Sequence, residues 1–443
     1  MSQGFSNIAD ETTDKKLPEQ IASKVYIPDL GITELTLKNG MKVVLKPTDF
    51  ETNEILIRII SSGGYSTLPV DKYPSGVIAA QTAWESGLDN LTSDQLSVLL
   101  YKHFIELNVK IHPFSRLIEG STDSDGLPTV LKLVGMLFMQ PHFSKEAFNT
   151  VIKETKESLS KRACDRDTNF DDVFKITNTQ NYPYLRPLTP ELLDKADFST
   201  AKEFFEYSFS DPAKYIAIVV GDFKIEENLN VIAQTLGAIR EKQVNFDPPS
   251  LSYPKFPRGI SNKCIKINSR SDSLVRMTFP LASPLDQMQL QPFEVATEVL
   301  ESRLREIFRD SFKSSLGISV AYEFPLYPLL YRPWLVIQYR CSPRQVDKVK
   351  EIILDEIKKL KQVGPTKTEL EKVLSNIKRT DEFWLRENSY WSVTLSNYYI
   401  WGWNPVYAVK SFEYIEKLTP QEIKKIITEY IPLDNYTIIN FHP

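Results

Sequence analysis

The sequence predicts an α+β protein made of two tandem homologous domains, each with helices packed on one mainly antiparallel sheet. Two observations lead to this prediction. Segments with strand-like alternation and segments with helix-like spacing of apolar residues follow one another along the whole chain. A proline-rich stretch near the middle divides the chain, and the order of segments after it echoes the order before it.

The first domain is expected at residues 31–240, after a polar tail or linker at 1–30. It should open with a hairpin, because Leu35, Leu37, Met41, Val43 and Leu45 alternate around Asn39-Gly40, and both turn residues tolerate positive φ. The remaining expected elements are strands at 54–60, 109–111 and 215–223, and helices at 75–86, 92–107 and 130–138. The nearly all-apolar segment 215–223 indicates a central strand covered by helices.

The second domain is expected at residues 257–443, after a linker at 241–256; the stretch 240–257 contains four prolines. Its expected elements are strands at 274–279, 318–324, 333–341 and 436–441, and helices at 293–310, 344–361 and 367–386. The sequence supports a duplication. One expected helix begins with Leu188-Thr189-Pro190-Glu191 and leads to strand 215–223. Another begins roughly 230 residues later with Leu418-Thr419-Pro420-Gln421 and leads to strand 436–441.

The composition narrows the possible partners. The chain has 443 residues with a formal net charge of −4 and no basic stripe, so we expect no nucleic acid partner. No apolar run reaches the ~18 residues that cross a bilayer, so we expect no membrane partner and a soluble protein. Cys164, Cys264 and Cys341 are too few and too widely spaced for a disulfide framework. We interpret them as buried thiols in a reducing compartment, with the cytoplasm or an organelle matrix or stroma favoured.

The residues by themselves indicate no catalytic machinery. A zinc peptidase helix needs two histidines four residues apart, and the four histidines, at 103, 112, 142 and 442, contain no such pair. The sequence also lacks a Gly-x-Ser-x-Gly elbow, a Cys-x-x-Cys pair and a phosphate-binding Gly-x-x-x-x-Gly-Lys loop. We therefore expect no metal and no cofactor in this chain.

Three segments taken together resemble a known family. LTLKNGMKVVLKPTDF at 35–50, RPLTPELLDKADFSTAKEFF with YIAIVVGDF at 186–223, and the stretch from GPTKTELEKVL to NYYIWGWNP at 364–405 are similar to the pitrilysin/insulinase family of zinc metallopeptidases. They most resemble the non-catalytic half of its long bacterial and plastid-type members. The resemblance implies paired α+β domains that close around a substrate chamber.

The resemblance also implies that the zinc site is lost. An active half carries His-x-x-Glu-His on its first long helix, with two zinc ligands and a general base. Aligned on Gly87, Ile78, Gln81 and Thr82 stand at those three positions. None of them can take over its role. Glu154 and Glu157 lie in the region of the distal ligand and are interpreted as helix-surface charges.

Four residues are candidates for substrate binding. The family's non-catalytic half can lend an Arg and a Tyr near a Leu-Gly pair, but aligned on Leu316-Gly317 these positions hold Ser311 and Ile318. Arg305 and Arg309 are the nearest guanidinium groups, and surface charge is the alternative interpretation for both. Trp401 and Trp403 end an aromatic segment that could line the chamber, because rigid aromatic surface grips varied side chains at small entropic cost.

Three functions follow from these observations. The leading hypothesis is a non-catalytic half or subunit of a zinc metalloendopeptidase, which forms the chamber and positions peptide substrates while a partner half supplies His-x-x-Glu-His and zinc. The alternative is a structural or peptide-binding core subunit with no role in proteolysis. An independent enzyme with unrecognised chemistry is the third.

Overall fold

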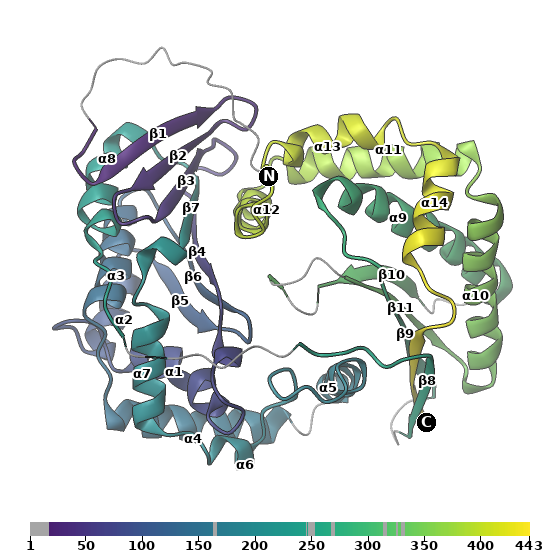
Figure 1. Ribbon diagram of the computed structural model, residues 1–443, viewed down its shortest axis with the longest axis horizontal. Helices are drawn as coiled ribbons and strands as arrows, with labels where there is room; N and C mark the ends of the chain where they lie inside the picture. Colours follow the sequence, from purple (N-terminus) through teal and green to yellow (C-terminus); the bar gives the residue numbers. More distant parts are fainter. Residues whose placement is uncertain are drawn as a thin grey trace.

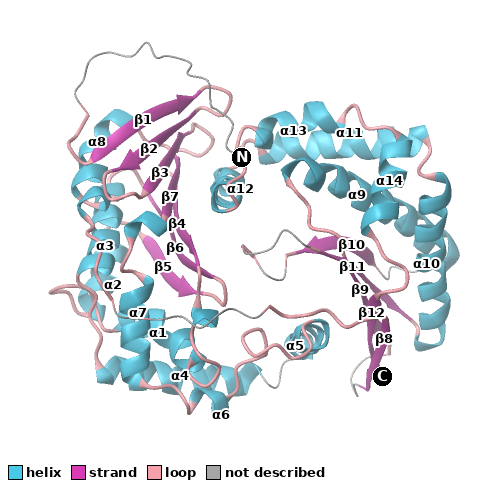
Figure 2. Cartoon of the chain, in the orientation of Figure 1, coloured by secondary structure: helices cyan, strands magenta, loops and turns pink. Residues whose placement is uncertain are grey.

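The computed structural model describes residues 17–162, 166–244, 246, 253–266, 271–312, 317–324, 327–328 and 333–443. Two sheets lie on opposite sides of the molecule, and most helices cover their outer faces (Figure 1). Figure 2 shows the same view with helices and strands in different colours. The predicted α+β fold class is therefore confirmed.

The first sheet has seven strands in the order β1-β2-β3-β7-β4-β6-β5. They are β1 (Ile21–Ile27), β2 (Ile32–Leu37), β3 (Lys42–Pro47), β4 (Ile55–Ser62), β5 (Glu106–Ile111), β6 (Ser115–Thr122) and β7 (Ile216–Gly221). All pairs are antiparallel except β3 with β7. Gly40, at φ 86°, forms the predicted hairpin turn between β2 and β3, and a Cβ there would lie 2.6 Å from Cβ of Ala213.

The outer face of this sheet is covered by helices. These are α1 (Tyr73–Glu85), α2 (Ser93–Lys102), α3 (Leu127–Met139), α4 (Lys145–Arg162), α6 (Pro190–Leu193), α7 (Phe198–Ser208) and α8 (Ile225–Gln234). A capping box begins α2, where the Thr92 hydroxyl accepts from the Gln95 backbone and the Gln95 side chain accepts from the Thr92 backbone. Phe104, within the helix expected at 92–107, is 78% exposed because the chain leaves the helix at His103.

The second sheet has five strands in the order β10-β11-β9-β12-β8. They are β8 (Ile260–Lys266), β9 (Ser273–Pro280), β10 (Ile318–Glu323), β11 (Trp334–Cys341) and β12 (Tyr436–His442). The helices around it are α9 (Gln287–Phe312), α10 (Val346–Val363), α11 (Lys367–Trp384), α13 (Tyr407–Ile415) and α14 (Pro420–Tyr430).

The strand order confirms the predicted duplication. Strands β8, β12, β9, β11 and β10 follow one another as β3, β7, β4, β6 and β5 do. In each sheet the last strand in sequence runs parallel to the first of these five and antiparallel to the next. The two predicted return strands, β7 and β12, therefore occupy equivalent positions.

Two helices lie on the inner faces of the sheets, and each packs on the sheet of the other domain. Helix α12 (Asn388–Ile400) lies between β11 and β12 of the second domain in sequence but packs on β4 and β7 of the first sheet. Helix α5 (Arg166–Asn178) belongs to the first half of the chain and contacts β12 of the second sheet. Figure 1 shows α12 and α5 on the inner sides of the two sheets.

Two sequence-based interpretations need correction. Strand β1 lies within the predicted polar tail at 1–30, because its backbone pairs with β2 although only Ile21 among its side chains is buried. Cys264 is exposed on β8, whereas Cys341 is buried as expected, and Cys164 lies outside the described residues. Part of the predicted linker at 241–256 also lies outside them, and the domain boundaries stay a prediction.

Candidate functional site

The positions aligned with the lost zinc site lie on α1. Ile78 is 2% exposed within the core under the first sheet, and Thr82 is fully buried, while Gln81 is exposed on the outside of the helix. Glu154 and Glu157 are exposed on α4. Within the described ranges, no group of three or more His, Cys, Asp or Glu side chains is placed to hold a metal ion.

The two candidate arginines lie on the surface of α9. Arg305 pairs with Glu301 one turn earlier at 2.6 Å, and Arg309 pairs with Asp310 at 3.2 Å. Both guanidinium groups are largely exposed. Ile318, at the position aligned with the family's Tyr, is buried in β10.

The two candidate tryptophans lie at the end of α12, away from these arginines. Trp401 is 8% exposed, and its indole donates to the carbonyl oxygen of Pro328 at 2.9 Å. Trp403 is half-buried, with its ring 4.7 Å from that of Trp401. Asn404, next to Trp403, donates to Gln287 Oε1 at the start of α9 at 2.8 Å. Arg305 and Arg309 lie near the other end of that 26-residue helix, about 27 Å or more away at roughly 1.5 Å per residue, so the structure does not bring the four candidates together.

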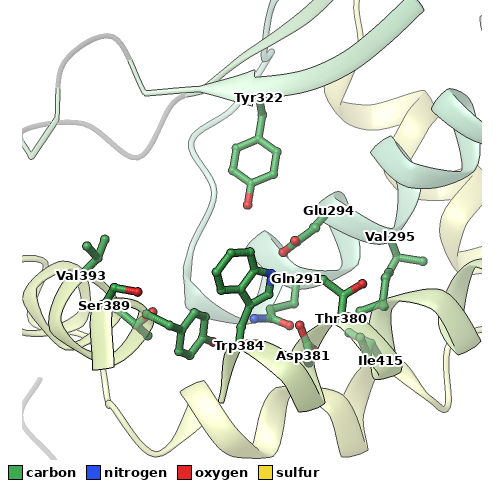
Figure 3. A pocket seen from close by; sticks show the side chains of 13 residues that line it. Gln291, Glu294, Val295, Tyr322, Thr380, Asp381, Trp384, Ser389, Val393 and Ile415 are labelled. Carbon is green, nitrogen blue, oxygen red and sulfur yellow. The ribbon is translucent and has the colours of Figure 1, made fainter. Parts of the chain in front are cut away.

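A cavity that sequence reasoning missed lies between α9, α11, α12 and β10. Its volume is about 540 Å³. It is lined by Gln291, Glu294, Val295, Tyr322, Ile377, Thr380, Asp381, Trp384, Ser389, Tyr390, Val393, Thr394 and Ile415. Figure 3 shows the carboxyl groups of Glu294 and Asp381, the Tyr322 hydroxyl and the Trp384 ring directed into this space.

Local structure sets the positions of these side chains. Glu294 lies in the second turn of α9, and Asp381 and Trp384 lie one turn apart in the last turns of α11. The α12 wall is fixed by Asn388, a buried residue at the start of that helix. Asn388 accepts from Thr48 Oγ1 at 2.6 Å and donates to Glu54 Oε2 at 2.8 Å. The first sheet therefore holds one wall of a cavity built mainly from the second domain.

The ionisable carboxyl groups in the cavity have no basic side chain to balance them among the lining residues. Burial, together with the nearby carboxylates of Asp381 and Glu298, raises the pKa of Glu294 to about 7, although a hydrogen bond with Tyr322 opposes this shift. Burial also raises the pKa of Asp381 to about 6. None of the lining side chains named above is basic. Two poorly solvated carboxyl groups thus share this space without a cation among its lining residues.

A second feature of the inner faces is an arginine at equivalent places in both sheets. Arg58 on β4 pairs with Glu119 on β6 at 3.1 Å, and Glu119 also pairs with Lys110 on β5 at 2.7 Å. Arg276 on β9, the equivalent strand, donates to Gln338 on β11 at 2.9 Å. Cross-strand pairing places each arginine directly opposite its partner. The duplication therefore extends to individual polar side chains.

Comparison with known proteins shows which family part of this chain resembles. Residues 199–377 match the family described as Peptidase M16 inactive domain. This part of the chain is similar to the M16 peptidases. The predicted resemblance to the pitrilysin/insulinase peptidases is confirmed, and the matching segment is the family's inactive domain.

Curated relatives of this chain are zinc proteases and processing peptidases. It is 27% identical over 401 residues to the zinc protease PQQL-like of Arabidopsis thaliana, covering 87% of this chain and 39% of the relative. It is 19% identical to the probable zinc protease PqqL of Escherichia coli, covering 96% and 46%. With the chloroplastic stromal processing peptidase of Pisum sativum it shares 21% identity, covering 84% and 33%. The chain thus spans between a third and a half of the length of these relatives.

Solved structures share the fold. The periplasmic protease PqqL from Escherichia coli has a TM-score of 0.80 at 15% identity, over 99% of this chain and 48% of that one. A peptidase M16 inactive domain from Pseudomonas fluorescens has a TM-score of 0.75 at 13% identity, over 94% of this chain and 98% of that one. At these identities the likeness concerns the fold alone. Among the described residues, no helix is long and apolar enough to span a membrane.

Proposed function

We propose that this chain is the non-catalytic half of a zinc metalloendopeptidase, where it walls a substrate chamber and positions peptide for a partner half that carries zinc. The observation that carries the proposal is the cavity of about 540 Å³ beside α12, which is lined by residues of the second half of the chain and whose α12 wall is tied to the first half by the hydrogen bond from Asn388 to Glu54. A rigid site of this kind accelerates chemistry performed elsewhere by fixing the peptide.

Three further observations support this role. Ile78 and Thr82 fill the core where zinc ligands would have to reach a metal, so this chain offers no replacement for a catalytic helix. The curated relatives named above are zinc proteases and processing peptidases more than twice as long as the matched segment. A structural neighbour, the ferredoxin protease FusC, was solved in complex with Arabidopsis ferredoxin. We propose a polypeptide substrate for this chain as well.

The finer assignments are part of the same proposal. The linker at 241–256 divides the domains, with the second at 257–443 and the first ending at 240; the first domain includes β1 and so begins before residue 31. The compartment is reducing, either the cytoplasm or an organelle matrix or stroma, which fits the chloroplastic processing peptidases among the relatives. Arg305, Arg309, Trp401 and Trp403 contact substrate only in the assembled enzyme, since the structure separates the arginines from the tryptophans within this chain.

The decisive experiment is reconstitution with the catalytic half. A His-x-x-Glu-His polypeptide encoded next to this chain, or in one reading frame with it, should cleave a peptide library at least about tenfold faster when this chain is added. Addition of this chain without any change in rate would favour the alternative, a structural or peptide-binding core subunit. One zinc bound per isolated chain by metal analysis would contradict the non-catalytic assignment.

A variant series tests the candidate residues. Trp403→Ala should leave the melting temperature nearly unchanged and weaken the activity of the assembled pair. The reason is that Trp403 is only half-buried, so part of its aromatic ring is accessible to a substrate. The double variant Arg305→Ala/Arg309→Ala is the matching test for the arginines. Loss of several kcal/mol of stability in Trp403→Ala, with unchanged peptide affinity, would limit this aromatic cluster to a role in packing.

A further inference from the structure

The cavity between α9, α11 and α12 combines three properties that restrict what it can bind. Its carboxyl groups, from Glu294 and Asp381, are held by two different helices and point into one space (Figure 3). Beside four uncharged polar residues, its walls carry apolar and aromatic side chains, with Val295, Val393 and Ile415 among them. At its rim the Trp384 ring is 43% exposed, although large aromatic side chains are usually covered.

Charge complementarity decides between possible occupants. An acidic side chain would meet two carboxyl groups, and a purely apolar one would leave both without compensation in a poorly solvated space. A basic side chain satisfies both parts of the site, since its aliphatic stem packs on apolar walls while its cationic end meets the carboxylates. The planar guanidinium of arginine can in addition stack on the Trp384 ring.

We propose that this cavity binds a basic side chain, preferably arginine, of the polypeptide that the chain positions. The assignment rests on the proposed peptide-positioning function and adds a substrate class to it. Glu294 and Asp381 bind the cationic end, and Trp384 covers it. Because Asn388 ties the α12 wall to the first sheet, the pocket is complete only when both domains are folded together.

The test is fluorescence anisotropy with the full chain and a set of labelled ten-residue peptides. Each peptide is a neutral Ser/Ala/Gly sequence with blocked ends and one variable central residue: arginine, lysine, citrulline or norleucine. Citrulline has nearly the shape of arginine without its charge. We expect the arginine peptide to bind about tenfold more tightly than the citrulline peptide, with lysine between them.

Isosteric variants locate the effect. Glu294→Gln and Asp381→Asn should each reduce the preference for arginine over citrulline, and the double variant should reduce it to within about twofold. Glu382→Gln is the matched control, because Glu382 neighbours Asp381 on α11, is exposed and does not line the cavity. It removes the same charge and should leave the preference intact.

Two outcomes would overturn the assignment. One is equal binding of the arginine and citrulline peptides to the unaltered chain, a result that does not depend on how any variant folds. The other is a preference that survives in the double variant while its melting temperature matches that of Glu382→Gln. In either case, binding of all four peptides would leave the peptide-positioning function standing, whereas no binding of any peptide would count against both.

Discussion

Helices α12 and α5 each cover the inner face of one sheet, but they use different side chains to do so. Helix α12 covers the first sheet through Trp391, Leu395 and Tyr398, which belong to a cluster of nine buried residues. Helix α5 covers the second sheet through Phe170 and Phe174, in a cluster of seven. Each helix lies on the sheet of the other half of the chain, so each sheet is completed by residues far away in sequence.

The polar contacts of the two helices differ more than their apolar ones. Beneath α12, the buried Lys46 ammonium lies 4.0 Å from the Trp391 ring centre and donates to the Leu30 carbonyl, and burial lowers its pKa to about 8. At the end of α5, Asn178 is fully buried and bridges two strands of the second sheet, donating to Thr278 at 3.2 Å and accepting from Thr437 at 2.6 Å.

This difference shows how a duplicated fold can diverge while its architecture is kept. The first sheet accepts a cation beneath its covering helix because an aromatic ring and a carbonyl oxygen compensate the charge. The second sheet uses a neutral amide whose donor and acceptor are both satisfied. We expect both arrangements to make the two domains unfold together, since neither sheet keeps its inner cover without the other domain.

The largest expected effect is at Trp391. Trp391→Ala removes a ring that is 3% exposed, leaves a cavity and exposes Lys46, so it should lower the free energy of unfolding by about 3–5 kcal/mol. Urea denaturation followed by circular dichroism measures this loss. Val393→Ala on the exposed side of α12 is the control, with an expected change of at most about 0.5 kcal/mol. Similar results for the two variants would mean that α12 contributes little to the stability of the first sheet.

The corresponding change on the other helix is Phe174→Ala. Phe174 is 3% exposed and contacts the Trp334 ring edge-on, so its loss should cost about 3 kcal/mol. Exposed Lys175 provides the control variant Lys175→Ala. Hydrogen exchange then sharpens the comparison: if the domains unfold together, amides of both sheets lose protection to the same degree. Faster exchange confined to β9 and β12 would show that the second sheet opens alone.

A smaller effect is expected at Asn178. Asn178→Ala leaves the hydroxyls of Thr278 and Thr437 without their buried partner, which should cost about 2 kcal/mol. The triple variant with Thr278→Val and Thr437→Val removes the unpaired hydroxyls as well and should recover part of this loss. No recovery would indicate that the cavity left by the amide, rather than unpaired polar groups, accounts for the cost.

The smallest effect concerns the cavity on the other side of α12. Because the pKa values of Glu294 and Asp381 are raised in the folded chain, to about 7 and about 6, the folded state holds protons that the unfolded state releases. Stability should therefore fall as pH rises from about 5 through 7. Glu294→Gln/Asp381→Asn removes this dependence, so its melting temperature should exceed that of the unaltered chain by a few degrees at pH 7.5.

This advantage should shrink towards pH 5, where the unaltered chain keeps both carboxyl groups largely protonated. Glu382→Gln serves as control, because the Glu382 side chain is exposed and does not line the cavity. Melting curves at pH 5, 6 and 7.5 are sufficient. An advantage that is equal at all three pH values would show that the two carboxyl groups are not responsible.

The sequence alone determined the local parts of this protein. Apolar periodicity located most strands and helices, Asn39-Gly40 specified a hairpin, and Thr92, Thr366 and Thr419 marked helix starts as capping residues. These signals arise between residues close together in the chain, so they can be read from its letters. The LTP segments pointed to the duplication, but their threonines cap helices at different places: Thr189 caps α6, with α7 between it and β7, whereas Thr419 caps α14, which leads directly to β12.

Only the tertiary structure decided how these parts meet. Helix α12 could be recognised as aromatic and helical, but its packing on the first sheet depends on contacts more than 300 residues apart, such as Asn388 with Glu54. The cavity unites Glu294, Tyr322, Asp381 and Tyr390 from four separate elements, each of which looks like an ordinary surface or core residue in its own segment. Strand β1, at the edge of the first sheet, has no clear apolar pattern in the sequence. Backbone pairing with β2, and not burial of its side chains, holds it in place.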